Sequence, residues 1–408
     1  MQYLFTERAH LMCPRMHFGI VLSVRFPYEE ARIRDALAQL SAAHPFLNAL
    51  LGYEKEKNAY YYRMTDRPTT ELLLKGCELP CTDSHEVFDE YETLTSRDWD
   101  LFSEGMLKIS AWPMNGGTCF LLVFHHLLAD GRGALGLAEE LADCYDRGIR
   151  PKRAEEQLIA SAEEFPADSG LPFISRFLVG RANKAQAKEK NVVSWQEYHA
   201  FADEFLKTDP IRYSLTRSTS DKLEEILRQC HGHGVTVNDY LLARMMSEEQ
   251  TDRVTIACDL RDLLDCRHEG ALGNYSTAFS VKVKRNDKDL FSLAEDVHQQ
   301  VRRIMNRPAD LYLVLQCYAA LDPAVIDAAF ISCRGGFHSR PGRFVGSRFF
   351  GYDTAKGYCI TNLGKTESES MTSAFFIPPA NPAIRKTQGV LTLNGVMIVC
   401  TGERQKAL

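Results

Sequence analysis

The sequence lacks the signals that direct a chain out of the cytoplasm or into a membrane. Residues 1–8 contain neither a basic segment nor an apolar run of the kind found in signal peptides. The densest apolar run, 119–124, is much shorter than the roughly 20 residues that span a bilayer. None of the 12 cysteines forms a C-x-x-C pair. We therefore expect a cytoplasmic protein with reduced thiols and no transmembrane segment.

The sequence also lacks an excess of positive charge. Its 48 Lys and Arg residues stand against 54 Asp and Glu residues, which gives a formal net charge of −6. A nucleic-acid partner requires a basic surface, so we expect no such partner. Hydrophobic residues make up 45% of the 408 residues, which is enough for one or two full cores and excludes a disordered or fibrous chain.

Several catalytic and metal-binding patterns are missing as well. No G-x-S-x-G motif occurs, so the sequence does not support an α/β-hydrolase nucleophile. The residues from Gly364 onward resemble the end of a P-loop, but Cys359 occupies the position of the required glycine. Two groups of Cys and His residues, within 77–85 and 230–233, do not have the spacing of zinc sites. We expect no bound metal.

Strand and helix patterns alternate in both halves of the sequence, which predicts an α/β (α+β) fold. The predicted strands are 16–26, 106–112, 118–124, 211–217, 253–259, 275–283, 358–362, 389–393 and 396–401. The predicted helices are 28–43, 131–145, 221–230, 237–247 and 290–305. Gly and Pro crowd 334–357, so we predict a long loop there.

The segment from about 148 to 191 shifts to a composition rich in Lys, Arg, Glu, Ala and Pro, which indicates a linker with crossover helices. Its apolar stripe consists of Phe173, Ile174, Phe177 and Leu178. We expect this stripe to pack on its own lobe. A helix that lies in a membrane interface is the alternative.

The segment with the clearest chemical content follows the apolar strand 118–124. The strand ends in His125 and His126, a short turn carries Asp130, and Gly131 begins a helix. Neighbouring side chains of a strand point to opposite faces, so only one histidine is expected to face a given cavity. A histidine at the end of a buried strand is suited to proton transfer near neutral pH. The alternatives are a satisfied core pair of histidines or a metal site with Asp130.

The string H-H-x-x-x-D-G after an apolar strand resembles the signature of the chloramphenicol-acetyltransferase-like superfamily of thioester-dependent acyltransferases. This superfamily includes the condensation domains of non-ribosomal peptide synthesis, alcohol acetyltransferases and polyketide-associated acyltransferases of secondary metabolism. Further segments resemble this family in order and rough spacing, from about residue 16 to 400: these are 99–107, 234–243, 259–261, 272–275 and 361–364.

The resemblance implies two similar lobes, arranged as a V-shaped pseudo-dimer with a central channel. The first lobe would cover 1–185 and the second 192–408. His126 would be the general base of a catalytic centre that also contains Asp130. His125 and Gly131 would support the site structurally, with the glycine keeping the mouth of the channel open. Asp130 would form a buried pair with Arg261 of the second lobe.

The resemblance further implies that an acyl group moves from a thioester to a hydroxyl or amine. The co-substrate would be acyl-CoA or an acyl group on a separate carrier protein, because no Gly-Gly-x-Ser carrier signature occurs in the chain. The partners would be the small-molecule donor and acceptor, with no bound cofactor. The Asp-Phe-Gly-Trp-Gly motif of the plant-type branch is absent. A stand-alone condensation enzyme and an inactive binding homologue are the alternatives.

The sequence gives weaker signals for the residues that would contact the oxyanion and the acyl donor. Ser276, Asn274 and Asn362 are candidates for oxyanion stabilisation or substrate contact, although the two asparagines are also typical of turns. Cations at the channel mouth would meet the phosphates of CoA. The candidates are Arg334, Arg340, Arg343 and Arg348, and the alternative is a solvated basic loop.

Overall fold

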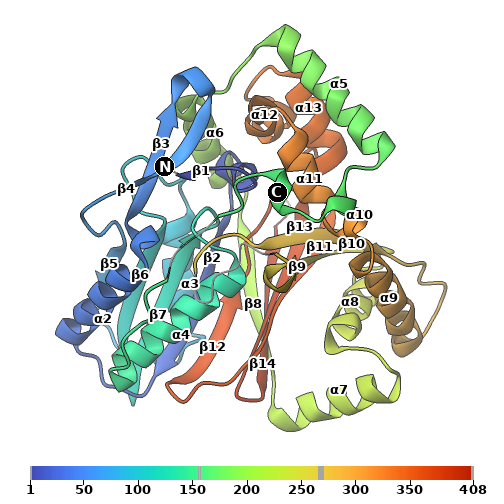
Figure 1. The fold of residues 1–408 in the computed structure, drawn as a ribbon. Coiled ribbons are helices and arrows are strands. Elements are labelled where there is room, and N and C mark those ends of the chain that lie inside the picture. The colour runs from blue at the N-terminus through green and yellow to red at the C-terminus, as the bar shows by residue number, and fades with distance from the viewer. Residues whose placement is uncertain (1, 155, 157, 265–270, 406–408) are drawn as a thin grey trace.

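The computed structural model describes residues 2–154, 156, 158–264 and 271–405. It contains two α/β halves, each built on its own sheet and its own hydrophobic core (Figure 1). The sequence prediction of a two-lobed α/β fold is confirmed.

The sheet of the first half has five strands in the order β12-β2-β7-β6-β5. All neighbours are antiparallel except β5 and β6. The strands are β2 (His17–Val24), β5 (Glu71–Leu74), β6 (Leu107–Met114), β7 (Gly117–His125) and β12 (Met371–Ile377). Every residue of β7 is buried, which explains its continuous apolar sequence. The helices beside this sheet are α2 (Glu30–Ala43), α3 (His85–Thr95) and α4 (Gly131–Arg147).

The sheet of the second half has six strands in the order β10-β9-β11-β13-β14-β8. Its strands are β8 (Ile211–Ser218), β9 (Arg253–Asp259), β10 (Ser276–Lys282), β11 (Gly357–Thr366), β13 (Ile384–Leu393) and β14 (Val396–Arg404). The helices α7 (Ser220–Gly232), α8 (Val237–Glu248) and α9 (Leu290–Met305) belong to this half. Helix α8 begins with the predicted capping box between Thr236 and Asp239.

The remaining elements are a small sheet and seven further α-helices in the described ranges. The small sheet contains β1 (Gln2–Tyr3), β3 (Ala49–Glu54) and β4 (Ala59–Met64). The other helices are α1 (Arg8–Leu11), α5 (Phe173–Glu189), α6 (Trp195–Thr208), α10 (Pro308–Leu311), α11 (Leu313–Ala320), α12 (Pro323–Cys333) and α13 (Arg340–Val345). Within the described ranges, no single helix is long and apolar enough to cross a bilayer. Together α11 and α12 meet that length and composition, but they are bent by 107° and nearly all of α12 is buried.

Two sequence predictions are wrong. The stretch 334–357 is not a loop with little regular structure, because it contains α13 and a π-helical turn, Gly346–Phe350. Ser339 caps α13 by accepting a hydrogen bond from the Gly342 N–H, which is a start signal that the crowding of Gly and Pro obscured. The apolar stripe of α5 does not pack on its own lobe either, since Phe173, Ile174 and Phe177 are exposed.

Strand β12 crosses between the halves. It lies in the second half of the sequence, yet it pairs with β2, with Phe376 opposite Ile20. Helix α6, which follows the linker, also contributes Trp195 and Tyr198 to the core of the first half. The spatial halves are therefore not identical to the sequence ranges 1–185 and 192–408.

Candidate functional site

The two adjacent histidines occupy different environments at the end of β7. The backbone N–H of His125 donates to Met106 and that of His126 donates to Met16, so the neighbouring segments hold both residues. The His125 ring is buried beside His17 and Trp99, whereas His126 lines a cavity of about 500 Å³. Only one histidine therefore faces the cavity, as strand alternation predicts.

Asn274 fixes the orientation of the His126 ring. The amide oxygen Oδ1 of Asn274 lies 2.8 Å from Nδ1 of His126, and its Nδ2 donates to the His126 carbonyl at 2.7 Å. The backbone carbonyl of His126 can only accept a hydrogen bond, so the Asn274 atom that faces it must be the amide nitrogen. The other amide atom is then the oxygen, which can only accept a hydrogen bond from Nδ1. The proton of a neutral His126 is consequently on Nδ1, and Nε2 carries the free lone pair.

The surroundings of His126 keep the ring neutral at pH 7. Burial lowers the pKa of His126, and the hydrogen bond to Asn274 and the charge of Asp130 oppose this effect only in part. The His10 ring stacks on His126 with ring centroids 4.3 Å apart. Burial also lowers the pKa of His10 and of His125 well below the ordinary value. Uncharged imidazoles therefore surround a lone pair that is available to accept a proton.

Asp130 and Arg261 form the expected pair between the two halves. The guanidinium donates to both carboxylate oxygens, at 2.8 Å and 3.0 Å, and both side chains are largely buried. The carboxylate also accepts from the backbone N–H groups of Gly133 and Tyr275, each at 2.9 Å. With four donors in place, Asp130 is a positioning residue that caps α4 and holds the histidine turn, rather than a second proton carrier.

Gly131 allows α4 to approach the second half closely. A Cβ atom at this position would lie 2.5 Å from Cδ2 of Leu363, which belongs to β11. Beside it, Arg132 donates to the Leu363 carbonyl oxygen at 2.5 Å. The absence of a side chain at Gly131 therefore lets α4 contact β11 of the second half at the edge of the cavity.

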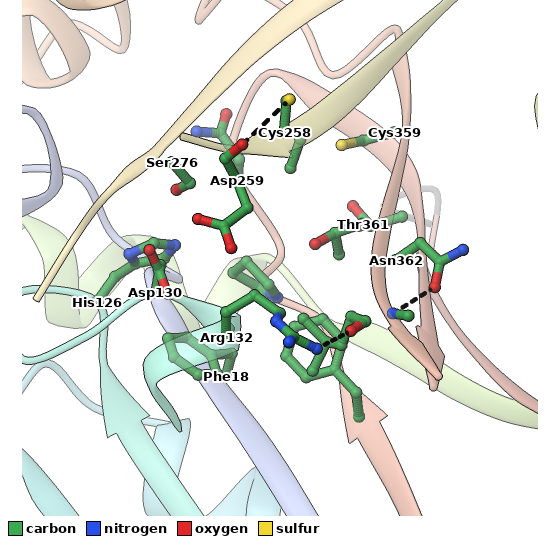
Figure 2. Close-up of a pocket in the computed structure, with 18 of the residues that line it drawn as sticks. Phe18, His126, Asp130, Arg132, Cys258, Asp259, Ser276, Cys359, Thr361 and Asn362 are labelled. Carbon is green, nitrogen blue, oxygen red and sulfur yellow. Dashed lines mark hydrogen bonds between the residues drawn. The ribbon is translucent and has the colours of Figure 1, made fainter. Parts of the chain in front are cut away.

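The cavity lies between the two halves (Figure 2), and a second cavity of about 680 Å³ adjoins it. Residues of the first half on its wall are Phe18, His126, Asp130, Gly131 and Arg132. The opposing wall comes from β9, β10 and β11. The two cavities share the lining residues Cys359, Asn381 and Ile384, so they adjoin each other at these side chains.

The three oxyanion candidates differ once the geometry is known. Asn274 does not line the cavity, and both ends of its amide bind His126, so its contacts orient the histidine ring. The Oδ1 of Asn362 accepts from the Gly364 N–H at 2.8 Å beside an irregularity of β11, which is the turn role weighed for it. Ser276 lines the cavity, and so does Thr361, which the sequence analysis missed. Figure 2 shows Ser276 on the side of His126 and Thr361 across the cavity.

Three of the four arginines predicted to line the mouth of the channel lie away from it. Arg340 and Arg343 line a separate hollow near Ser339, and the Arg334 guanidinium lies over the Phe205 ring. Only Arg348 lies near the channel, in a hollow that adjoins the second cavity. The cations that line the second cavity are Arg253, Arg303 and Arg307. They were not identifiable from the sequence, because β9, α9 and the start of α10 bring them together only in the fold.

Among the described residues, no three Cys, His, Asp or Glu side chains gather as a possible metal site. The two Cys and His groups considered in the sequence, and the trio of His125, His126 and Asp130, therefore do not form a ligand set there.

Comparison with known proteins supports the fold. No family model matches the sequence, and a search of curated proteins finds no match. Solved structures do match over nearly the whole chain. The condensation domain of the monacolin K polyketide synthase MokA aligns with a TM-score of 0.60 and 11% identity, covering 100% of this chain and 92% of that one.

Two further structures give the same result. Polyketide synthase associated protein 5 from Mycobacterium tuberculosis aligns with a TM-score of 0.58 and 13% identity, covering 99% of this chain and 92% of that one. The epimerization domain of tyrocidine synthetase B aligns with a TM-score of 0.57 and 16% identity, covering 98% and 87%. The chain therefore has the fold that these condensation and epimerization domains share with polyketide synthase associated protein 5.

Proposed function

We propose that this chain is a thioester-dependent acyltransferase that moves an acyl group to a hydroxyl or amine, with His126 as the general base. One observation carries the proposal. Asn274 holds Nδ1 of His126 protonated, which leaves the lone pair on Nε2 of a ring that lines the cavity between the two halves. A base with a lowered pKa is unprotonated at neutral pH and ready for this task.

The proposed reaction has two proton transfers at Nε2. The acceptor hydroxyl or amine gives its proton to Nε2 as its oxygen or nitrogen forms a bond with the thioester carbonyl carbon. The carbon–sulfur bond of the tetrahedral intermediate then breaks, and the leaving thiolate takes the proton back from Nε2. The products are an ester or amide and a free thiol. General base help of this kind contributes about 10²–10⁴ in rate.

Ser276 and Thr361 are the proposed contacts for the oxyanion and substrate. Both hydroxyls line the cavity with His126, and no hydrogen bond to another described side chain engages either of them. A hydroxyl donates one hydrogen bond without adding charge, which suits an oxyanion that exists only during the reaction.

The donor thioester is proposed to enter through the second cavity, as acyl-CoA or on a separate carrier protein. Arg253, Arg303 and Arg307 are exposed cations on the wall of this cavity. Arg307 is paired with Asp310, and Arg253 donates to Ser280. Arg303 has no ion pair with any described residue, so its charge is free for a phosphate.

The first experiment compares His126→Ala with His125→Ala on a library of acyl-CoA donors and acceptors, with product mass spectrometry and thiol release as readouts. We expect His126→Ala to lose about 10²–10⁴ of the turnover while its thermal midpoint stays near that of the wild type. His125→Ala is the matched control and should lose stability more than turnover, because its ring is part of the core. Undiminished thiol release by His126→Ala would refute the proposal.

The second experiment separates the two donors. Arg303→Ala is compared with Arg343→Ala, which removes an equal charge away from the channel. For a CoA donor, the KM should rise with salt in the wild type, and this salt dependence should weaken in Arg303→Ala only. Equal salt dependence in all three proteins favours delivery by a carrier protein, which is the condensation-type alternative.

A further inference from the structure

The outer face of α5 carries large apolar side chains that nothing in the structure covers. Phe173 is 81% exposed, Ile174 70% and Phe177 60%. They are the three most exposed large apolar side chains of the described chain. At positions i, i+1 and i+4, they form one contiguous surface at the start of the helix. A contiguous apolar surface on an otherwise polar protein marks a contact with another phase or molecule.

The exposure is not a sign of a loosely placed helix. The opposite face of α5 buries Val179, Ala182 and Gln186 against a cluster formed with α11, α12 and α13. The side chain of Asn183 also joins the helix to its neighbours, since it donates to the Ala320 carbonyl oxygen and accepts from the Asp322 N–H. The helix is therefore held firmly while its apolar end projects outward.

The same outer face continues as a basic surface. Arg181, Lys184 and Lys188 follow Phe173 and Phe177 at helical spacing, and all three are exposed. None of these three cations has an ion pair with a described residue. The net charge of the whole chain is −6, so this positive face contrasts with the rest of the molecule and complements an anionic surface.

We propose that the outer face of α5 docks on an anionic membrane surface. In this arrangement Phe173, Ile174 and Phe177 enter the boundary between headgroups and acyl chains, to a depth of about 5–10 Å. Arg181, Lys184 and Lys188 then meet the lipid phosphates along the interface. Figure 1 shows α5 at the outer edge of the molecule, where the helix protrudes. A protruding helix suits a fluid surface that deforms around it.

The fold also gives this contact a direction relative to the channel. Helix α5 packs on α11, and Leu313 and Val314 of α11 line the second cavity. Helix α11 therefore separates the proposed membrane-contacting helix from the second cavity. The docking itself does not depend on the proposed acyl transfer.

The test is flotation of the full-length protein with vesicles of phosphatidylglycerol and phosphatidylcholine, compared with vesicles of phosphatidylcholine alone. We expect the wild type to float with the anionic vesicles at low salt, and less so at high salt. The double variant Phe173→Ser/Phe177→Ser should lose at least about tenfold in vesicle affinity, because two buried aromatic side chains are removed from the interface. Lys184→Glu/Lys188→Glu should lose the preference for anionic lipid.

The matched control is Met64→Ser/Leu227→Ser, which removes two exposed apolar side chains elsewhere. It should float like the wild type, and all variants should keep the wild-type thermal midpoint. Failure of the wild type to float, or an equal loss in the control, would overturn the proposal. A wild-type dimer that Phe173→Ser/Phe177→Ser converts to a monomer, without vesicle binding, would assign this face to a second copy and also overturn it.

Discussion

At the scale of single residues, the site depends on which atom of His126 is available. The motif predicted a histidine that faces the cavity, and the fold places His126 there. The tautomer depends on Asn274, which is 148 residues away in the sequence. No local pattern encodes that contact, so the sequence analysis treated Asn274 as an oxyanion candidate. Its actual role is to orient the ring.

The Asn274 contact makes a prediction for the pH profile. As the pH is lowered, the wild type should lose activity only below the usual pKa of histidine. Burial lowers the pKa of His126, and the neutral ring is the active form. In Asn274→Asp, a carboxylate beside Nδ1 favours the imidazolium, so the acid limb should move up by about 1–3 pH units.

The profile of kcat/KM against pH measures this shift, and Asn362→Asp is the control. Asn362 lines the same cavity but does not contact His126. An acid limb that moves equally in both variants would mean that Asn274 acts through general charge rather than through the ring.

A second prediction concerns His44, which lies buried between two carboxylates. Burial disfavours the charged ring, but the short contact of Nε2 with Glu140 and the proximity of Glu156 outweigh burial and raise the pKa of His44 to about 9. Glu140 dominates, since the Glu156 oxygen is 3.5 Å away and forms no hydrogen bond. A raised pKa stabilises the folded state fully below about pH 6.5, and this contribution is lost as the pH rises through about 9.

Urea unfolding at several pH values measures the effect. Between about pH 6.5 and 9, this one group should lower the free energy of unfolding by about 1.4 kcal/mol per pH unit at most. His44→Gln should remove that slope, and His85→Gln should keep it, because His85 is exposed. Identical slopes in His44→Gln and the wild type would show that the ring is neutral in the folded protein.

At the scale of elements, the sequence predicted the helices and strands whose apolar residues follow a regular spacing. It missed features that depend on tertiary contacts. The periodic segments of β7, α4 and α8 were found at nearly their true bounds. The short helix α13 was missed because Gly and Pro crowd the stretch 334–357 that contains it. The apolar stripe of α5 was found, but its exposure depends on what the rest of the fold leaves uncovered, which periodicity does not determine.

The junction between α4 and the second half gives the prediction at this scale. Asp130 caps α4 and binds Arg261, so either Asp130→Asn or Arg261→Met leaves a buried group without its partner. Each single change should cost about 3–5 kcal/mol of unfolding free energy. The double variant should lose less than the sum, and a double-mutant cycle by urea unfolding measures the difference. Strictly additive losses would contradict direct coupling.

At the scale of the whole molecule, the two halves share elements, so neither is complete alone. Strand β12 from the second half of the sequence closes the edge of the first sheet at β2. Arg8 and Asp327, which are 319 residues apart, form a buried ion pair at 2.6 Å. The resemblance predicted two lobes with a channel, but the strand exchange follows from pairing across the fold and was not visible in the sequence.

This sharing predicts that the protein unfolds as one unit. We expect a single calorimetric transition whose calorimetric and van't Hoff enthalpies agree, although a chain of this length often unfolds in separate steps. Asp130→Asn should lower the whole transition rather than split it, because losing the junction loosens both halves together. A fragment of residues 1–185 should aggregate, since the edge of β2 that β12 covers would be free to pair with other chains. Two separate transitions in the wild type, or a monomeric folded fragment, would show that β12 joins two halves that are each stable without it.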